Sequence, residues 1–323
     1  MKALNTMKSN EVKGTWLGLL GVAIFALTLP MTRIATGTPE LPQLSGAFIA
    51  LGRAAVAALL SIAFLIVTRA PWPQQRDWWP LAVTSVGVVF GFPLFSSVAM
   101  RHVEATHASV IVGVLPLATA AVGALLHRQR PSTGFWLCAA LGSGLVVAFA
   151  LQGINKQPGL HMADALLLAA MGCAAVGYGY GAQLAQRMRA EHVICWALVV
   201  GLPLSLPAAL MTRPQDGIAP SAWWGFAYVA VFSMWLGFFA WYRGLALGGT
   251  VRVSQTQLLQ PFLGMLVAVP LLGEQLDAVT LYFALAVVAT VLVGRKMPVT
   301  PAPMTELRTT KQALSTPTPE EVL

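Results

Sequence analysis

Ten apolar stretches, each long enough to cross a lipid bilayer, occupy nearly all of this chain. A helix needs about 20 mostly apolar residues to span a hydrocarbon core about 30 Å thick. The predicted spans cover residues 14–35, 44–67, 79–100, 106–127, 133–151, 162–185, 193–211, 222–243, 252–272 and 278–296. We therefore predict an all-α polytopic membrane protein with ten transmembrane helices.

The composition supports helices in lipid over the other fold classes. Hydrophobic residues make up 57% of the chain and charged residues 10%, whereas a soluble domain is about one quarter charged. Strands of a membrane barrel would appear as segments of about ten residues with alternating polarity. These stretches are longer and continuously apolar. Helices suit them because a helix satisfies its own backbone hydrogen bonds.

The net charge of +8 is explained better by membrane topology than by a nucleic-acid partner, and we expect no nucleic acid. With the N-terminus in the cytoplasm, 15 of the 20 Lys and Arg residues lie on the cytoplasmic side and three on the outer side. Arg33 and Arg53 fall within spans. The positive-inside rule then predicts a multi-pass protein of the inner (plasma) membrane with both termini cytoplasmic.

A weak internal duplication is visible at an offset of 145 residues. The matched pairs are Ser109 and Ser254, Pro116 and Pro261, Val122 and Val267, Leu126 and Leu271, Ala139 and Ala284, and Val146 and Val291. Each half contains five spans, and five is odd. The second half must therefore cross the bilayer in the opposite orientation, which predicts an inverted repeat of the kind that transporters use.

Three segments resemble a known family. They are LPMTRIA, which contains Arg33; ALGRAAVAAL, which contains Arg53; and LQPFLGMLVAVPLLGEQLD, which contains Pro261, Gly273 and Glu274. On these residues the chain resembles the drug/metabolite transporter (DMT) superfamily and, within it, the ten-span EamA type. The first-half copy, VLPLATAAVGALLHRQRPS, departs from the pattern, with Arg128 and Gln129 where Gly and Glu are expected.

The resemblance implies a substrate pathway between two five-helix halves and the export of small metabolites or amino acids. The expected organisation is a cytoplasmic segment at 1–13, a first EamA-like repeat at 14–151, a connector at 152–161, a second EamA-like repeat at 162–296 and a disordered cytoplasmic tail at 297–323.

Arg53 is a candidate substrate-binding residue because an ionisable group inside a span is costly and usually functional. It lies about a third of the way into its span. An arginine there can line a polar cavity and hold a substrate carboxylate at two points, or it can bond to backbone carbonyls. For Arg33, nearer a helix end, we expect snorkelling or a contact with a helix terminus.

Phe232, Trp235, Phe239 and Tyr242 follow one another at helical spacing, which predicts a single aromatic face. Trp235 and Phe239 lie too deep for the interfacial belt in which tryptophan is common. The face can stack against a substrate, or it can be ordinary helix packing. We take Trp235, Phe239 and Tyr242 as candidate substrate-binding residues.

Polar and glycine-rich segments supply the remaining substrate candidates. Gln257 and Gln260 precede Pro261 in an unusually polar span, and amides in lipid must face protein, water or a ligand. Interhelical hydrogen bonding is the alternative. Tyr178 and Tyr180 alternate with three glycines, whose small size favours close helix packing and bending. These two tyrosines are candidates for the substrate pocket.

His107 and Glu274 are candidates for a gate or a coupling site, because every Asp and Glu lies at a helix end or in a connector. Glu274 can instead be a solvated helix end. The absence of paired acidic or histidine residues at helical spacing within a span argues against a membrane enzyme. No ATP-binding motif, metal site or cofactor motif occurs. Cys138, Cys173 and Cys195 are expected to be inert thiols.

These observations predict a secondary transporter, an exporter working by alternating access, with no catalytic residues, no metal and no cofactor. Its expected partners are a small-molecule substrate and the lipid bilayer, and it is expected to be a monomer or a homodimer. The alternative is a membrane-embedded sensor or scaffold without transport activity.

Overall fold

The computed structural model of the chain describes residues 2–126, 130–152, 161–214, 217–248, 253, 255–297 and 299–300. Several predicted features lie outside these residues. They are Arg128 and Gln129, which replace the expected Gly and Glu of the family pattern, the repeat residue Ser254, most of the 152–161 connector, and the tail beyond residue 300.

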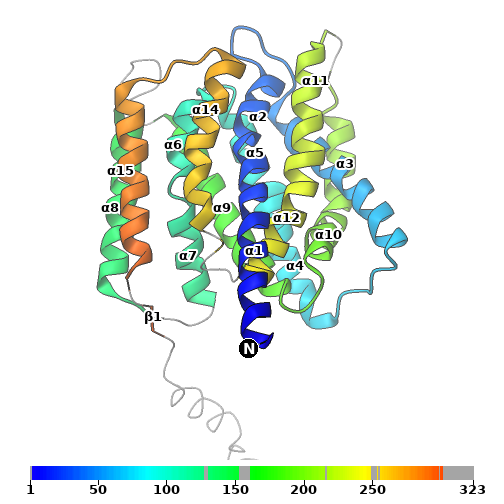
Figure 1. Cartoon of the computed structure of the whole chain (residues 1–323). Coiled ribbons are helices and arrows are strands. Elements are labelled where there is room, and N and C mark those ends of the chain that lie inside the picture. The colour runs from blue at the N-terminus through cyan, green and yellow to red at the C-terminus, as the bar shows by residue number, and fades with distance from the viewer. Residues whose placement is uncertain are drawn as a thin grey trace, which may run out of the picture.

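The structure is a bundle of helices (Figure 1). Within the described residues the only strands are a two-residue antiparallel pair, β1 (Arg130–Pro131) and β2 (Val299–Thr300). The helical elements are α1 (Lys2–Ala26), α2 (Thr28–Thr36), α3 (Gly46–Val67), η1 (Gln75–Asp77), α4 (Trp78–Thr84), η2 (Ser85–Gly91), α5 (Phe92–Ala99), α6 (Ala105–Val112), α7 (Leu115–Leu126), α8 (Thr133–Gln152), α9 (Met162–Leu184), α10 (Ala190–Met211), α11 (Pro220–Ala227), η3 (Tyr228–Leu236), α12 (Gly237–Gly248), η4 (Gln255–Leu259), α14 (Gln260–Leu272) and α15 (Ala278–Arg295).

Seven helical stretches among the described residues are long and apolar enough to cross a membrane. They are Asn10–Thr36, Gly46–Val67, Gln75–Ala99, Ala105–Leu126, Met162–Leu184, Ala190–Met211 and Pro220–Gly248. Three shorter apolar helices, Thr133–Phe149, Thr256–Leu272 and Ala278–Gly294, correspond to the other predicted spans. The helical fold with apolar helices of membrane-spanning length is thus confirmed, and the count of ten crossings stays a prediction.

Two spans contain a π-helix at matching places. The third span passes from α4 through η2 to α5, and the eighth from α11 through η3 to α12. The repeat offset of 145 residues places Ser85–Gly91 on residues 230–236, which lie inside η3. π-Helices are rare and occur often at functional sites. Their paired occurrence therefore supports the predicted duplication.

Prolines interrupt the fourth and ninth spans. Pro116 is the second residue of α7, and Pro261 is the second residue of α14. Proline has no N–H group, so the carbonyls of Val112 and Gln257 receive no helical hydrogen bond from it. Broken helices of this kind provide binding groups at the centre of many transporters.

Glycines allow helix backbones to approach one another closely. A Cβ atom added to Gly87 of η2 would lie 2.6 Å from the carbonyl oxygen of Cys173 on α9. One added to Gly14 of α1 would collide with the backbone of Gly248 at the end of α12. Larger residues at Gly14 and Gly87 would force these helices apart.

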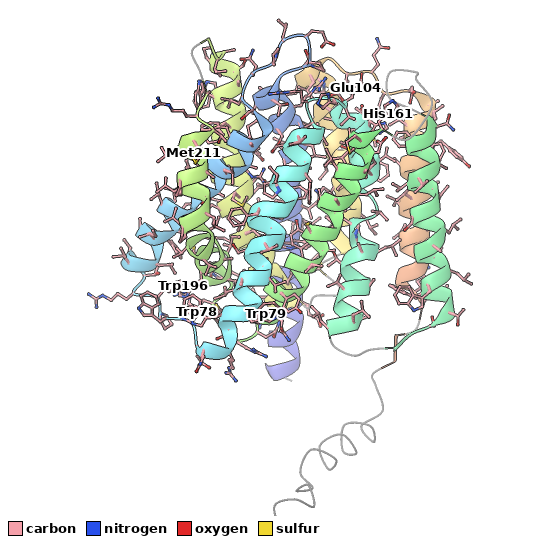
Figure 2. The ribbon with its side chains drawn as sticks, turned by 180° about the vertical axis from the view of Figure 1, so that it is seen from behind. Trp78, Trp79, Glu104, His161, Trp196 and Met211 are labelled. Carbon is pink, nitrogen blue, oxygen red and sulfur yellow. The ribbon has the colours of Figure 1, made fainter. Side chains whose placement is uncertain are left out.

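The bundle has two distinct ends. Figure 2 shows Glu104 and His161 at one end and Trp78, Trp79 and Trp196 at the other. Helix α1 begins at the tryptophan-bearing end, where β1 also lies, and α8 and α15 stand side by side at one edge (Figure 1). The first and last described helices thus have their outer ends at the same face.

Candidate functional site

A cavity lies at the centre of the bundle, where elements from both halves of the sequence meet. Its free volume is about 20 Å³, which accommodates about one water molecule. The lining residues are Phe25, Thr28, Leu29, Arg53, Val88, Phe92, Val112, Leu115, Ala174, Tyr178, Ser233, Phe238 and Gln260. The conformation is therefore closed, with polar and aromatic groups facing one small space.

Of the described residues in this lining, Arg53 alone is permanently charged, and it is 2% exposed. Neither its Nε nor its Nη1 atom has a hydrogen-bond partner among the described residues, and no described carboxylate forms an ion pair with it. Its Cζ atom lies 6.0 Å from the centre of the Phe92 ring. Because a cation–π contact contributes only about 0.5–2 kcal/mol, most of the cost of burying this charge is not offset by the protein.

The rest of the cavity wall joins the two halves. The hydroxyls of Thr28 on α2 and Ser233 on η3 are hydrogen-bonded at 2.8 Å. The side-chain oxygen of Gln260 is buried and has no partner in the described part of the chain. Phe25 and Phe238 pack with ring centres 5.1 Å apart. One side of the cavity is thus polar with unused hydrogen-bonding capacity, and another side is aromatic.

Three of the predicted substrate residues, Arg53, Tyr178 and Gln260, line the cavity, whereas the three candidates from the eighth span, Trp235, Phe239 and Tyr242, do not. Trp235 and Phe239 pack against Phe64 of α3, at ring-centre distances of 6.1 and 5.0 Å. From this span the cavity receives Ser233 and Phe238 instead.

The predicted aromatic face is present only in part: Trp235 and Phe239 contact each other with ring centres 5.0 Å apart, but Phe232 and Tyr242 lie elsewhere. Phe232 is 47% exposed, whereas Tyr242 is completely buried and its hydroxyl lies 3.4 Å from the carbonyl oxygen of Gly177. The physical reason is the π-helix η3, which contains Phe232 and Trp235. A π-helix bonds residue i to i+5, so helical 3- and 4-residue spacing no longer keeps side chains on one face.

Tyr180 and Gln257 also lie outside the cavity lining. Tyr180 is half-buried and follows Tyr178 by two residues on α9, which turns the two side chains to different faces. Gln257 is buried in η4, and both of its amide atoms lack partners among the described residues. Gln257 thus remains a candidate substrate-binding residue, because its amide group can still donate and accept hydrogen bonds.

Glu274 connects the two halves at one end of the bundle. Ala105 N–H and Thr106 N–H, at the start of α6, donate to its two carboxylate oxygens at 2.8 Å each. Gly273 positions it, because this residue ends α14 in the left-handed conformation with φ of 69°, which glycine adopts without strain. The LGE sequence therefore ends one helix and caps another, and a carboxylate is favoured at a helix N-terminus.

His107 has a partner that the sequence pattern did not reveal. Its Nε2 atom lies 2.7 Å from Oδ1 of Asp164, which is completely buried at the start of α9. The other Asp164 oxygen accepts a hydrogen bond from His161 N–H at 3.2 Å. His107 and Asp164 are 57 positions apart in the sequence, and no periodic signal connects them.

Arg33, Arg101 and Glu104 lie at the same end. Arg33 Nη1 donates to the carbonyl oxygens of Met100 and Arg101 at 2.7 and 2.6 Å, which is the helix-end contact expected for it. Burial, and secondarily the charge of Glu274, raises the pKa of Glu104. We call Arg33, Glu104, His107, Asp164 and Glu274 the Glu274 cluster.

The opposite end is held by ordinary ion pairs. Arg187 Nη1 lies 3.5 Å from Oδ1 of Asp77, and Arg243 Nη1 lies 2.6 Å from Oε1 of Glu191. Both arginines extend toward solvent. We call these four residues the Arg187 cluster. Of the two pairs, only Asp77 with Arg187 joins the first half of the sequence to the second.

Comparison with known proteins identifies the family. The profile of the EamA-like transporter family matches twice, at residues 12–150 and 161–294. An uncharacterized transporter of Bacillus subtilis (strain 168), YdeK, is 41% identical over 291 residues, which cover 89% of this chain and 99% of the relative. A protein of known crystal structure superposes with a TM-score of 0.62 at 17% identity, covering 88% of this chain and 96% of that one. This structural likeness concerns the fold alone.

Proposed function

The chain belongs to the EamA-like transporter family, and on this premise we propose that it exports small metabolites or amino acids across the inner membrane by alternating access. Family membership makes it a membrane transporter. The observation that carries the proposal is the central cavity, whose wall is formed by both halves and contains buried polar groups without partners. Such groups are costly unless a ligand or water pairs with them.

The closed cavity requires the two halves to move. Sites for small molecules have volumes of about 300 Å³ or more, whereas this cavity has about 20 Å³. A substrate therefore enters only when lining residues such as Thr28 and Ser233 separate. The contacts at the two ends of the bundle would then break in turn, which is the mechanism that inverted repeats support.

The proposed orientation places the Arg187 cluster in the cytoplasm and the Glu274 cluster outside. It rests on the uneven distribution of Lys and Arg, and the structure agrees in bringing the first and last described helices to one face (Figure 1). Reporter fusions at Lys13 and after Lys296 should both indicate the cytoplasm. Reports from opposite sides would contradict both the orientation and the inverted repeat.

Transport itself can be tested by a reversible lock across the cavity. The hydroxyls of Thr28 and Ser233 are 2.8 Å apart, so the double variant Thr28→Cys, Ser233→Cys can form a disulfide. Cys138, Cys173 and Cys195 are first replaced by serine. Liposomes containing this protein are loaded with a cell extract of small metabolites, and release is followed by mass spectrometry.

We expect reduced protein to release specific metabolites and oxidised protein to release none, because the disulfide keeps the cavity closed. The two samples differ only in one bond, so each is the control for the other. Equal release from reduced protein, oxidised protein and empty liposomes would refute transport and favour a sensor or a scaffold.

A further inference from the structure

The charge of the cavity narrows the class of substrate, and this step rests on the proposed transport function. We infer that the protein carries small monocarboxylates of net charge −1 that have an apolar body and a neutral hydroxyl or N–H group, and that it discriminates against zwitterionic amino acids and against cations. Hydroxy acids and N-acylated amino acids belong to this class.

Charge balance is the first argument. Arg53 contributes one positive charge to the lining, and among the described residues that line the cavity there is no Asp, Glu or His. A substrate with a single carboxylate makes the closed cavity neutral. A zwitterion brings its ammonium group into the same enclosed space, where no carboxylate receives it and Arg53 repels it. Unpaired charges are strongly disfavoured in such a space.

The hydrogen bonds left unused by Arg53 provide the second argument. Nε carries one N–H group and Nη1 carries two, and neither atom has a partner among the described residues. Nε and Nη1 lie on different edges of the guanidinium, each next to Nη2, and a carboxylate accepts two bonds in the guanidinium plane along either edge. The face of Phe92 lies against the guanidinium, so a bound carboxylate would be held at the edge of that plane.

Gln260 supplies the third argument, for a neutral donor on the substrate. Its side-chain oxygen is buried without a partner in the described part of the chain and faces the cavity. A hydroxyl or amide N–H of the substrate would satisfy it without adding charge. The Thr28 and Ser233 hydroxyls, already bonded to each other, leave one O–H group for a further acceptor.

The remaining wall fits an apolar body. Phe25 and Phe238 face the cavity together with Leu29, Val88 and Leu115. A substrate whose carboxylate lies on Arg53 would place its side chain among these residues. The cavity therefore offers complementary groups for each part of the proposed molecule.

The test compares compounds that share one skeleton and differ in charge. Binding of phenyllactate, 3-phenylpropionate, phenylalanine and phenylalaninamide to the purified protein is measured by titration calorimetry. The pair 2-hydroxyisocaproate and leucine repeats the comparison with an aliphatic body. We expect each hydroxy acid to bind at least tenfold more tightly than its amino acid, 3-phenylpropionate to bind less tightly than phenyllactate, and phenylalaninamide not to bind.

Variants separate binding from folding. Arg53→Met should weaken phenyllactate binding at least tenfold while leaving the melting temperature equal to or above that of the wild type, because it removes an uncompensated buried charge. Gln260→Leu should remove the advantage of phenyllactate over 3-phenylpropionate. Arg213→Gln, in an exposed loop, is the matched control and should bind as the wild type does.

The outcomes distinguish this inference from the transport proposal. If amino acids bind as tightly as hydroxy acids, or if no acid binds while the reduced double-cysteine protein releases metabolites, the substrate class is wrong and transport stands. If the reduced protein releases nothing, the transport proposal itself fails. Tight phenyllactate binding that survives Arg53→Met would also overturn the inference.

Discussion

The two ends of the bundle are held closed by different kinds of contact. In the Glu274 cluster, charged side chains bond to helix termini or to one another in partly buried positions, at 2.6–2.8 Å. In the Arg187 cluster, the one contact between the two sequence halves is 3.5 Å long, and its arginine is 38% exposed. Exposed ion pairs contribute about 0–1 kcal/mol, whereas a charged helix cap contributes about 1–2 kcal/mol.

This difference indicates which end opens more easily. Three hydrogen bonds, two to Glu274 and one between His107 and Asp164, join the halves at the Glu274 end. At the Arg187 end the polar contact is one weak pair, beside apolar packing such as that of Trp72 against Trp196. In the proposed orientation, the polar contacts therefore resist opening toward the outside more than opening toward the cytoplasm. Four predictions test the comparison, and each measures the strength of one contact.

The largest effect is expected for Asp164→Ala. This change leaves His107 without its buried partner and removes a helix cap, at a cost of about 2–3 kcal/mol in the free energy of unfolding. The free energy can be measured by denaturant titration in micelles. His161→Ala is the control, because its ring lies 4.0 Å from Asp164 and contributes little. Equal losses of unfolding free energy in Asp164→Ala and His161→Ala would show that the His107–Asp164 hydrogen bond does not stabilise the fold.

The second prediction concerns opening at the Glu274 end. Glu274→Ala removes two charge-assisted bonds to α6, and a change of about 1–2 kcal/mol shifts the ratio of open to closed molecules about 5–30-fold. A cysteine at the cavity residue Leu29 (Leu29→Cys), in a background without native cysteines, reports opening through its reaction with an impermeant maleimide added on the Glu274 side. Its rate should rise by that factor.

Asp277→Asn serves as the control for Glu274→Ala. Asp277 lies in the same loop but caps its own helix through Thr280, so the labelling rate should stay near that of the wild type. A Glu274→Ala protein labelled no faster than this control would show that the cap does not hold the end closed.

A smaller effect is expected from acid. Because the pKa of Glu104 is raised in the closed conformation, protonation of Glu104 favours closure as the pH falls from its raised pKa toward the ordinary carboxyl value. Labelling of Leu29→Cys should slow over that range. In Glu104→Gln it should already be slower at neutral pH and should not change through the same range. Faster labelling in acid would show that protonation of Glu104 favours opening and would contradict this prediction.

The smallest effect is expected at the opposite end. Arg187→Ala breaks a partly exposed pair worth about 0–1 kcal/mol, so cavity labelling from the Arg187 side should rise less than about fivefold. Arg76→Ala, in the neighbouring η1, provides a control for the change in local charge. A larger rise than that produced by Glu274→Ala at its own end would invert the comparison between the two ends.

The helices of the bundle could be predicted from the sequence, because the length of an apolar segment and the charge of its flanking connectors are local properties of the chain. The span expected at 133–151 is α8 (Thr133–Gln152). The glycines around Tyr178 were expected to pack closely, and Gly177 lies against Gly87. The positions of Arg53 and Gln260 at the cavity were predictable, because a polar group within a span must face protein, water or a ligand and not lipid.

The predictions failed where the site depends on an irregular helix or on contacts between segments far apart in the sequence. A π-helix changed the angular spacing of Phe232 and Trp235, so a pattern written for an α-helix grouped the exposed Phe232 with the packed Trp235. Asp164 and the N-terminus of α6 are parts of contacts between distant segments, and no periodicity connects them to His107 or Glu274. Phe238, which lines the cavity, looked in the sequence like any other apolar residue of its span.

The unpaired guanidinium of Arg53 has a consequence for energetics. If its counter-ion is the substrate, each transport cycle moves one negative charge across the membrane. The membrane potential then acts on the cargo itself, with a free energy of about 2.3 kcal/mol per 100 mV, or roughly a 50-fold concentration ratio. A cell whose interior is negative would expel such an anion without help from any proton. A transporter that works in this way needs no carboxylate in the middle of its spans, and among the described residues none is found there.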